Sequence, residues 1–257
     1  MKKLSNGQVE EIIREAQAGA SLNQLSSKFG FSKTMIYYHV KGFCRKMGRF
    51  NEKRLFKWEK GYLVGFFVGD GCFNFRQKYY SYITKFALNA KSEKSIGCFL
   101  VDILRKAHTK PWVTTKGNRL ELRVSSKGLC SFLRRYAGYG TEDGKSRKRL
   151  LLENVHSKEF MLGILAGLID SDGCVTSDKV RYLRAMISTK SKILAVAMLR
   201  LTEKLKIKAT IHRSSGFTVR ISTPSLVINA ASIRSLKLEQ KLNWKSSHSN
   251  LGPIAQW

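Results

Sequence analysis

Two apolar stretches of the chain, residues 61–73 and 160–175, share one pattern of large, small and acidic positions. Each has glycines four positions apart and, close to its end, an Asp–Gly pair. Every matching position is displaced by 102 residues, and a fixed displacement of this kind indicates an internal repeat. The matched pairs are Gly61 and Gly163, Gly65 and Gly167, Asp70 and Asp172, Gly71 and Gly173, and Cys72 and Cys174.

The glycine spacing predicts that both stretches are helices that pack against each other. Residues four apart lie on one helix face, and a glycine inside a helix costs about 1 kcal/mol relative to alanine. Small residues along one stripe let two helix backbones approach closely. Because both helices carry the stripe, each is the natural partner of the other. The interface glycines are Gly61, Gly65, Gly163 and Gly167.

This packing brings Asp70 and Asp172 side by side at the C-terminal ends of the two helices. A carboxylate there faces the negative end of its helix dipole and the like charge of its twin. A divalent cation bound between the two carboxylates would offset both of these unfavourable interactions. Two carboxylates near a common axis are an oxygen-ligand site of the kind that suits magnesium.

After each helix, apolar and polar residues alternate, which predicts β-hairpins followed by amphipathic helices. In the first half we expect strands at 72–76 and 82–90, a helix at 92–106, strands at 112–115 and 119–124, and a helix at 127–136. In the second half we expect strands at 173–175 and 180–188, a helix at 192–206, strands at 207–212 and 217–222, and a helix at 224–233. The chain is therefore predicted to hold two α+β repeats of order αββαββα, residues 61–150 and 151–257.

Residues 1–48 are predicted to form a separate, all-helical module. Ser21 and Ser32 are suited to cap two short helices, and Gly30 lies in the turn between them. Helix, glycine-containing turn and helix are typical of a helix-turn-helix. In such a module the second helix, from Ser32 to about Lys46, enters the major groove. The candidate DNA contacts are Lys33, Thr34, Tyr37, Tyr38 and Lys41. Residues 49–60 form a basic linker.

The charge of the chain points to a polyanionic partner. There are 47 Lys and Arg against 18 Asp and Glu, a net charge of +29 spread along the sequence, as expected for binding nucleic acid. The five cysteines form no CxxC pair, so we expect free buried thiols in a reducing, intracellular compartment such as cytoplasm, nucleoid or organelle. No signal peptide or membrane-spanning run is visible, which predicts no membrane partner.

One face of each predicted sheet is left free by its helices. Two such sheets form a saddle whose polar strand positions can read base edges, with Arg and Lys facing guanine and Asn facing adenine. We expect Lys85 to be equivalent to Arg184, and Arg123 to Arg220. The candidate DNA-binding residues are Asn74, Arg76, Lys85, Asn89, Thr114, Lys116, Arg123, Arg184, Ser188, Lys208, Thr210, His212 and Arg220.

The stretch LAGLIDSDG (165–173) resembles the LAGLIDADG motif of homing endonucleases, and LVGFFVGDG (63–71) resembles a second, more divergent copy. In that family the residue before the final glycine is the metal-binding catalytic acid, which is Asp70 and Asp172 here. The resemblance also assigns Gly69 and Ser171 to the metal site, with Mg²⁺ or Mn²⁺ as cofactor. The earlier acidic position of the motif is Asp170 in one copy and Val68 in the other, and this position is not catalytic.

The resemblance further implies basic residues near the scissile phosphates. The candidates are Lys91 and Lys190 at the ends of matching strands, Lys145 after the first repeat, and Lys237 or Lys241 after the second. The family often has Gln before the strand-end lysine. Ala90 and Thr189 stand there in this chain, so water must be positioned differently.

The sequence thus predicts a monomeric, intron-encoded homing endonuclease that uses divalent metal to cut both strands of a long double-stranded DNA site. One alternative is a DNA-binding regulator without cleavage, against which the two retained aspartates argue. Another is an RNA-splicing maturase, whose partner is intron RNA.

Overall fold

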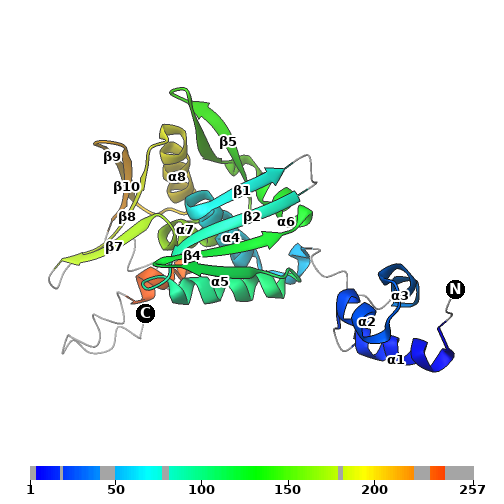
Figure 1. The fold of residues 1–257 in the computed structure, drawn as a ribbon. Coiled ribbons are helices and arrows are strands. Elements are labelled where there is room, and N and C mark those ends of the chain that lie inside the picture. Colours follow the sequence, from blue (N-terminus) through cyan, green and yellow to red (C-terminus); the bar gives the residue numbers. More distant parts are fainter. Residues whose placement is uncertain are drawn as a thin grey trace, which may run out of the picture. The chain divides into compact units, whose positions relative to one another are not determined.

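The computed structural model describes residues 4–17, 20–40, 50–76, 81–178, 182–222 and 232–240. The chain divides into two units, Met1–Gly48 and Arg49–Trp257, and each is described by itself (Figure 1). Most of the helix expected at 224–233 lies outside the described residues, as do Lys41, Cys44, Lys241 and the side chain of Arg76. None of the helices within the described ranges is both long and apolar enough to cross a membrane.

The first unit has three helices, α1 (Asn6–Gln17), α2 (Leu22–Phe29) and α3 (Lys33–Val40). Ser21 and Gln24 form a reciprocal capping box at the start of α2, and Gly30 ends it with a φ of 70°. The Oγ of Ser32 accepts from the N–H of Met35 at 3.3 Å, so the predicted second cap is confirmed. The core of the unit is Ile12, Ala16, Leu25, Ile36 and Val40.

The second unit is built around two helices, α4 (Lys57–Asp70) and α7 (Lys158–Asp170), which lie together at its centre (Figure 1). Their glycines face backbone atoms of the opposite helix. A Cβ on Gly61 would lie 2.0 Å from the carbonyl oxygen of Phe160, and one on Gly163 would lie 2.1 Å from that of Trp58. The predicted glycine interface is therefore confirmed: only glycine allows this approach.

A four-stranded antiparallel sheet belongs to each repeat. The strand orders are β1-β2-β4-β3 and β7-β8-β10-β9. Core side chains from the inner faces of both sheets join those of α4 and α7 in one hydrophobic cluster. The strands are β1 (Gly71–Arg76), β2 (Ser81–Asn89), β3 (Trp112–Lys116), β4 (Arg119–Ser125), β7 (Gly173–Asp178), β8 (Tyr182–Thr189), β9 (Ala209–Arg213) and β10 (Phe217–Ile221), and the helices packed on them are α5 (Lys94–Lys106), α6 (Lys127–Arg134) and α8 (Lys192–Lys204).

A further hairpin lies between the repeats and was not predicted. It consists of β5 (Ala137–Glu142) and β6 (Lys145–Leu150), joined by Asp143 and Gly144. Both turn residues have positive φ, 51° and 69°, as a tight two-residue hairpin turn requires. The first repeat is therefore followed by a two-stranded insertion and not by a plain linker.

The cysteines correct a second expectation. Those in the described ranges are free, as predicted, but Cys72, Cys98 and Cys174 are exposed and Cys130 is buried. Cys72 and Cys174 follow the motif glycines at the start of β1 and β7, where alternation turns their side chains to the outer face of the sheet.

Candidate active site

Asp70 and Asp172 lie where the C-terminal ends of α4 and α7 meet. A Cβ on Gly69 would lie 2.0 Å from the Oγ of Ser171 and 3.3 Å from the backbone nitrogen of Asp172. Burial raises the pKa of Asp70 to about 6, and the charges of Asp172 and Glu93 add to this effect. Burial also raises the pKa of Asp172, against the lowering effect of Lys148 and Lys237. At this site the ionised form of both carboxyl groups is therefore less favourable than it is in water.

Two lysines flank this acid pair in matching positions. The Nζ of Lys148, on β6, donates to the carbonyl oxygen of Gly69, and to that of Phe67 at 3.4 Å. The Nζ of Lys237 donates to the carbonyl oxygens of Ser171 at 2.9 Å and Gly173 at 3.2 Å. Gly69 and Ser171 are equivalent motif positions, so each helix end binds one ammonium group. Burial lowers the pKa of Lys148, and both aspartates oppose that shift.

Of the lysines expected from sequence, the structure brings some to the site. Lys190 lines a cleft beside Asp172, and Lys237 reaches the centre as described. Lys91 is exposed in the turn after β2, and Lys145 is exposed at the start of β6. Neither lines the clefts at the aspartates. On β6 it is Lys148, and not Lys145, that reaches the end of α4, and its position depends on the hairpin that was not predicted.

The oxygens at this centre fit a hard divalent cation. Asp70 and Asp172 supply carboxylates, and the carbonyl oxygens of Gly69 and Ser171 already bind ammonium groups, so they face a cationic region. No cluster of three or more His, Cys, Asp or Glu side chains suited to a metal occurs in the described ranges. A cation here would therefore rely on two carboxylates plus carbonyl or outside oxygens, as magnesium does.

The raised pKa of Asp70 predicts a specific pH dependence of stability. Since the folded protein holds this proton up to about pH 6, and the unfolded chain loses it near the ordinary value, the charged form destabilises the fold as pH rises. Without divalent metal, Asp70→Asn should therefore be more stable than the wild type at pH 7.5 by about 1–2 kcal/mol, after allowance for solvent screening. The difference should shrink towards pH 4.

Urea unfolding of both proteins at several pH values in EDTA measures this difference. Comparing the variant with the wild type at each pH cancels the other titrating groups. An advantage of the variant that stays constant from pH 4 to 7.5 would contradict the assignment.

The outer faces of the two sheets carry most of the predicted DNA-reading residues. On β2 and β4, Lys85 lies opposite Arg123, and both point away from the core. On β8, β9 and β10 the outward positions alternate with buried ones in the same way. The predicted residues found at outward or exposed positions are Asn74, Lys85, Asn89, Thr114, Lys116, Arg123, Arg184, Ser188, Lys208, Thr210, His212 and Arg220.

Strand register corrects one expected equivalence. Lys85 pairs with Cys72 and with Arg123, whereas the matching partners Cys174 and Arg220 both pair with Met186. The second-repeat position that matches Lys85 is therefore Met186 and not Arg184. The two sheets present different chemistry at this point, a cation in one and a thioether in the other.

Glu121 is a feature of the first sheet that the sequence did not reveal. Its carboxylate accepts from the Nε of Arg123, lies 3.4 Å from the Nζ of Lys85, and lies 3.7 Å from Arg119. The Arg123 hydrogen bond lowers the pKa of Glu121. The acid thus fixes the directions of basic side chains that were expected to read bases. Asn89 is similarly engaged, since its Oδ1 accepts from the N–H of Lys91 at 2.9 Å.

Three clefts open beside the acid pair, one at Asp70 and two at Asp172. The cleft at Asp70 is lined by Asn89, Glu93, Lys116 and Arg119 among others. The clefts at Asp172 are lined by Lys190 and by Arg147 from the β5–β6 hairpin. The Nε of Arg147 is buried and has no hydrogen-bond acceptor within the described residues. Basic side chains therefore line the clefts at both aspartates, but Glu93 lines only the cleft at Asp70 and Arg147 lines only the clefts at Asp172.

Sequence comparison identifies the motif region. A family model described as a LAGLIDADG-like domain matches residues 159–239, which is most of the second repeat. A curated relative, the ATP-dependent DNA helicase Hel308 of Thermococcus kodakarensis, is 30% identical over 161 residues. The match covers 61% of this chain and 14% of the helicase, so the chain spans about one seventh of that relative's length.

Structural comparison supports the same assignment of fold. The homing endonuclease I-DmoI in complex with DNA and Ca superposes with a TM-score of 0.50 at 22% identity, over 71% of this chain and 92% of that chain. The homing endonuclease I-WcaI bound to its DNA recognition sequence gives a TM-score of 0.52 at 13% identity, over 79% of this chain and 92% of that chain. Full-length DUF199/WhiA from Thermatoga maritima gives a TM-score of 0.50 at 15% identity, over 80% of this chain and 69% of that chain. At these identities the matches establish the fold.

Proposed function

We propose that this chain is a member of the LAGLIDADG homing endonuclease family, which it resembles in motif and fold, and that it is a site-specific endonuclease that cuts both strands of double-stranded DNA. The observation that carries the proposal is the pair Asp70 and Asp172, with raised pKa values, held between Lys148 and Lys237. Two acids and two cations at one junction suit phosphodiester hydrolysis.

Each group has a task in that reaction. Asp70 and Asp172 would hold Mg²⁺ or Mn²⁺ together with the carbonyl oxygens of Gly69 and Ser171. When bound, such a metal lowers the pKa of water and offsets charge on phosphate oxygens. Lys148 and Lys237 lie within reach of the same carbonyls and stabilise negative charge that develops at the phosphate. A lysine whose pKa is lowered, as that of Lys148 is, also exchanges protons more readily near neutral pH.

The rest of the chain supplies DNA affinity. The net charge of +29 favours duplex DNA through counterion release. Outward strand positions of both sheets would face the grooves, and the exposed Lys33, Thr34, Tyr37 and Tyr38 on α3 would lengthen the contact as a helix-turn-helix. Because Lys85 and Met186 differ at matching positions, the two half-sites need not be alike in sequence.

Selection from a random duplex library tests this proposal. The full chain is first bound in Ca²⁺, the cation of one I-DmoI–DNA complex. Enriched sequences are then cloned in a supercoiled plasmid and incubated with Mg²⁺. We expect linear product. Tight binding without any cut, in Mg²⁺ or Mn²⁺, would favour the regulator, and preferential binding and splicing of intron RNA would favour the maturase.

The unlike clefts predict that the two strands are cut at different rates. Arg147→Ala should slow the nicking of one strand by about tenfold or more relative to the other, since a hydrogen bond to a charged group is lost at one cleft only. Strand-specific end labels in single-turnover reactions measure both rates. Arg149→Ala is the matched control, because Arg149 packs on Gly140 in the same hairpin and lines neither cleft. Equal slowing of both strands would contradict the prediction.

A further inference from the structure

Asp170, the last residue of α7, is a fully buried acid in a protein whose other repeat has a hydrocarbon at that place. Asp170 has no solvent exposure, and the equivalent Val68 is also buried. Burying a carboxylate is unfavourable unless hydrogen bonds compensate. Burial raises the pKa of Asp170, and its hydrogen bonds oppose that shift. The acid therefore has a role in the second repeat that Val68 cannot have in the first.

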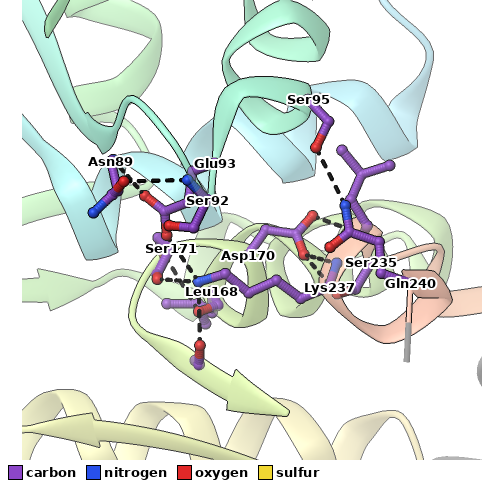
Figure 2. Close-up of polar contacts among 12 residues, drawn as sticks. Asn89, Ser92, Glu93, Ser95, Leu168, Asp170, Ser171, Ser235, Lys237 and Gln240 are labelled. Atoms are coloured by element: carbon purple, nitrogen blue, oxygen red, sulfur yellow. Dashed lines mark hydrogen bonds and ion pairs between the residues drawn. The ribbon is translucent and has the colours of Figure 1, made fainter. Parts of the chain in front are cut away.

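The partners of Asp170 are concentrated in one short segment. Its Oδ1 accepts from the Oγ of Ser235 at 2.6 Å and from the backbone N–H of Lys237 at 3.0 Å. Its Oδ2 accepts from the backbone N–H of Leu236 at 3.0 Å and from the hydroxyl of Tyr62 at 3.0 Å. Figure 2 shows the carboxylate directed at the turn where Ser235 and Lys237 lie.

These bonds fix the start of a helical segment. Ser235 also accepts from the N–H of Leu238 at 3.2 Å, as an N-cap does. The first backbone N–H groups of this helix have no partner within it, and Asp170 accepts two of them. The backbone of Lys237 is thereby anchored to the end of α7, one residue before Ser171.

The anchored backbone sets where the ammonium group of Lys237 lies. From there the Nζ reaches the carbonyl oxygens of Ser171 and Gly173, and it forms an ion pair with Glu93 at 3.1 Å (Figure 2). Glu93 is itself held by the N–H of Asn89 at 2.8 Å. The lysine therefore spans from the second repeat to the first, directly beside the acid pair.

Two further polar contacts of the segment 232–240 are made with α4 and α5, and the second of them is exposed to solvent. The indole N–H of Trp58 donates to the carbonyl oxygen of Ile233 at 3.1 Å, and the side chain of Gln240 donates to Ser95 at 3.3 Å. Lys148, by contrast, is held by the strand ladder between β5 and β6, where it pairs with Tyr139. The two lysines thus reach matching carbonyls from unlike elements, and only the second depends on a buried acid.

We propose that Asp170 is a positioning residue that docks the segment 232–240 and thereby holds Lys237 at the catalytic centre. This proposal rests on the endonuclease function for its kinetic test, but not for its structural one. Val68 in the first repeat needs no charge because β6 delivers Lys148 through strand pairing. The acid at this position of the motif acts through the lysine, without touching the DNA or the metal.

The kinetic test is a double-mutant cycle. Asp170→Asn keeps the size of the side chain but presents donors to backbone N–H groups. We expect its single-turnover cleavage rate to fall about 100-fold, since small misplacement of a catalytic group has an effect of this order, while the Kd for DNA changes less than about twofold. The cleavage rate of Lys237→Ala should fall by a similar factor. The double variant should cut no more slowly than Lys237→Ala alone.

Two further variants control the cycle. Gln240→Ala removes an exposed contact of the same segment and should cut at the wild-type rate. Ser235→Ala removes one bond to Asp170 without adding a donor, and it replaces Asp170→Asn if that protein does not fold. It should slow cutting only when Lys237 is present. Rate losses that multiply in the double variant would overturn the proposal.

Amide hydrogen exchange separates this proposal from the proposed function. Loss of protection at Leu236 and Lys237 in Asp170→Asn, with α4 and α7 still protected, supports the docking role even in a protein that cuts nothing. Unchanged protection at these two amides overturns it. A wild type that binds DNA without cutting would instead remove the endonuclease assignment alone.

Discussion

Replacing both Asp70 and Asp172 by asparagine should abolish DNA cleavage while leaving DNA binding intact. The two amides cannot hold a divalent cation between them as two carboxylates do, and they leave Lys148 and Lys237 in place. We expect the single-turnover rate to fall by about 10³-fold or more, equivalent to about 4 kcal/mol of barrier. Labelled target duplex and a gel-shift titration measure the rate and the Kd in parallel.

Binding should be equal or tighter in this double variant. Two negative charges leave a region that faces phosphates, and the remaining net charge of the protein becomes more positive. Each single variant should retain weak nicking of one strand, because the clefts at Asp70 and Asp172 are distinct. Linear product that persists in the double variant would contradict a mechanism in which Asp70 and Asp172 hold the metal.

Gly65→Ala should destabilise the second unit more than an ordinary core substitution. Its Cβ would lie 2.1 Å from the carbonyl oxygen of Ile164 and 3.0 Å from the Cα of that residue. These are backbone atoms of α7, so no rotamer change relieves the clash and the two helices must separate. We expect a loss of about 3 kcal/mol or more in unfolding free energy, and a fall in Tm of roughly 6–12 °C.

Gly97→Ala is the matched control for this substitution. Gly97 also lies inside a helix, α5, but its added Cβ would meet only the methyl groups of Leu120 and Leu88 at 3.8 Å. We expect a gain of about 0.5–1 kcal/mol, because alanine is the better helix former. Calorimetry of both variants compares the two sites. Similar Tm values for Gly65→Ala and Gly97→Ala would show that the helix contact tolerates side chains.

The paired helices and the acid pair were predictable because their signal is repeated. One glycine-rich helix with a terminal aspartate is ambiguous, but a second copy 102 residues away supplies its partner. The alternation along the strands likewise predicted which side chains point outward. These features are local or periodic, and periodicity is what a single sequence records best.

The β5–β6 hairpin was missed although a turn signal was present. Asp143 and Gly144 are typical of a two-residue turn, but the strand that follows, Lys145–Leu150, is almost entirely charged. Without alternating apolar residues this stretch gives no strand signal, so the sequence predicted no element there. The error carried forward to the lysines, since Lys148 reaches Gly69 only because β6 runs back along β5.

The role of Asp170 and the contact between Glu121 and Lys85 depend on partners distant in sequence. Asp170 contacts residues 65 to 67 positions away, and nothing in the motif predicts them. Glu121 and Arg123 are two residues apart on β4, but the contact of Glu121 with Lys85 depends on the register between β2 and β4. A register is set by turn geometry and packing of the whole sheet.

The hairpin between the repeats also means that the two duplicated halves are not interchangeable blocks. On β6, Lys148 completes the end of the first motif helix, while Glu142 on β5 accepts from Ser191 at 2.6 Å and from the N–H of Lys192 at 2.6 Å at the start of α8. Each strand therefore serves a different repeat. If the chain were cut at Asp143, the fragment with α4 would lack Lys148 and the fragment with α8 would lack Glu142. The hairpin that joins the two repeats therefore contributes contacts to both of them. One repeat could not be replaced by a copy of the other unless this hairpin were redesigned.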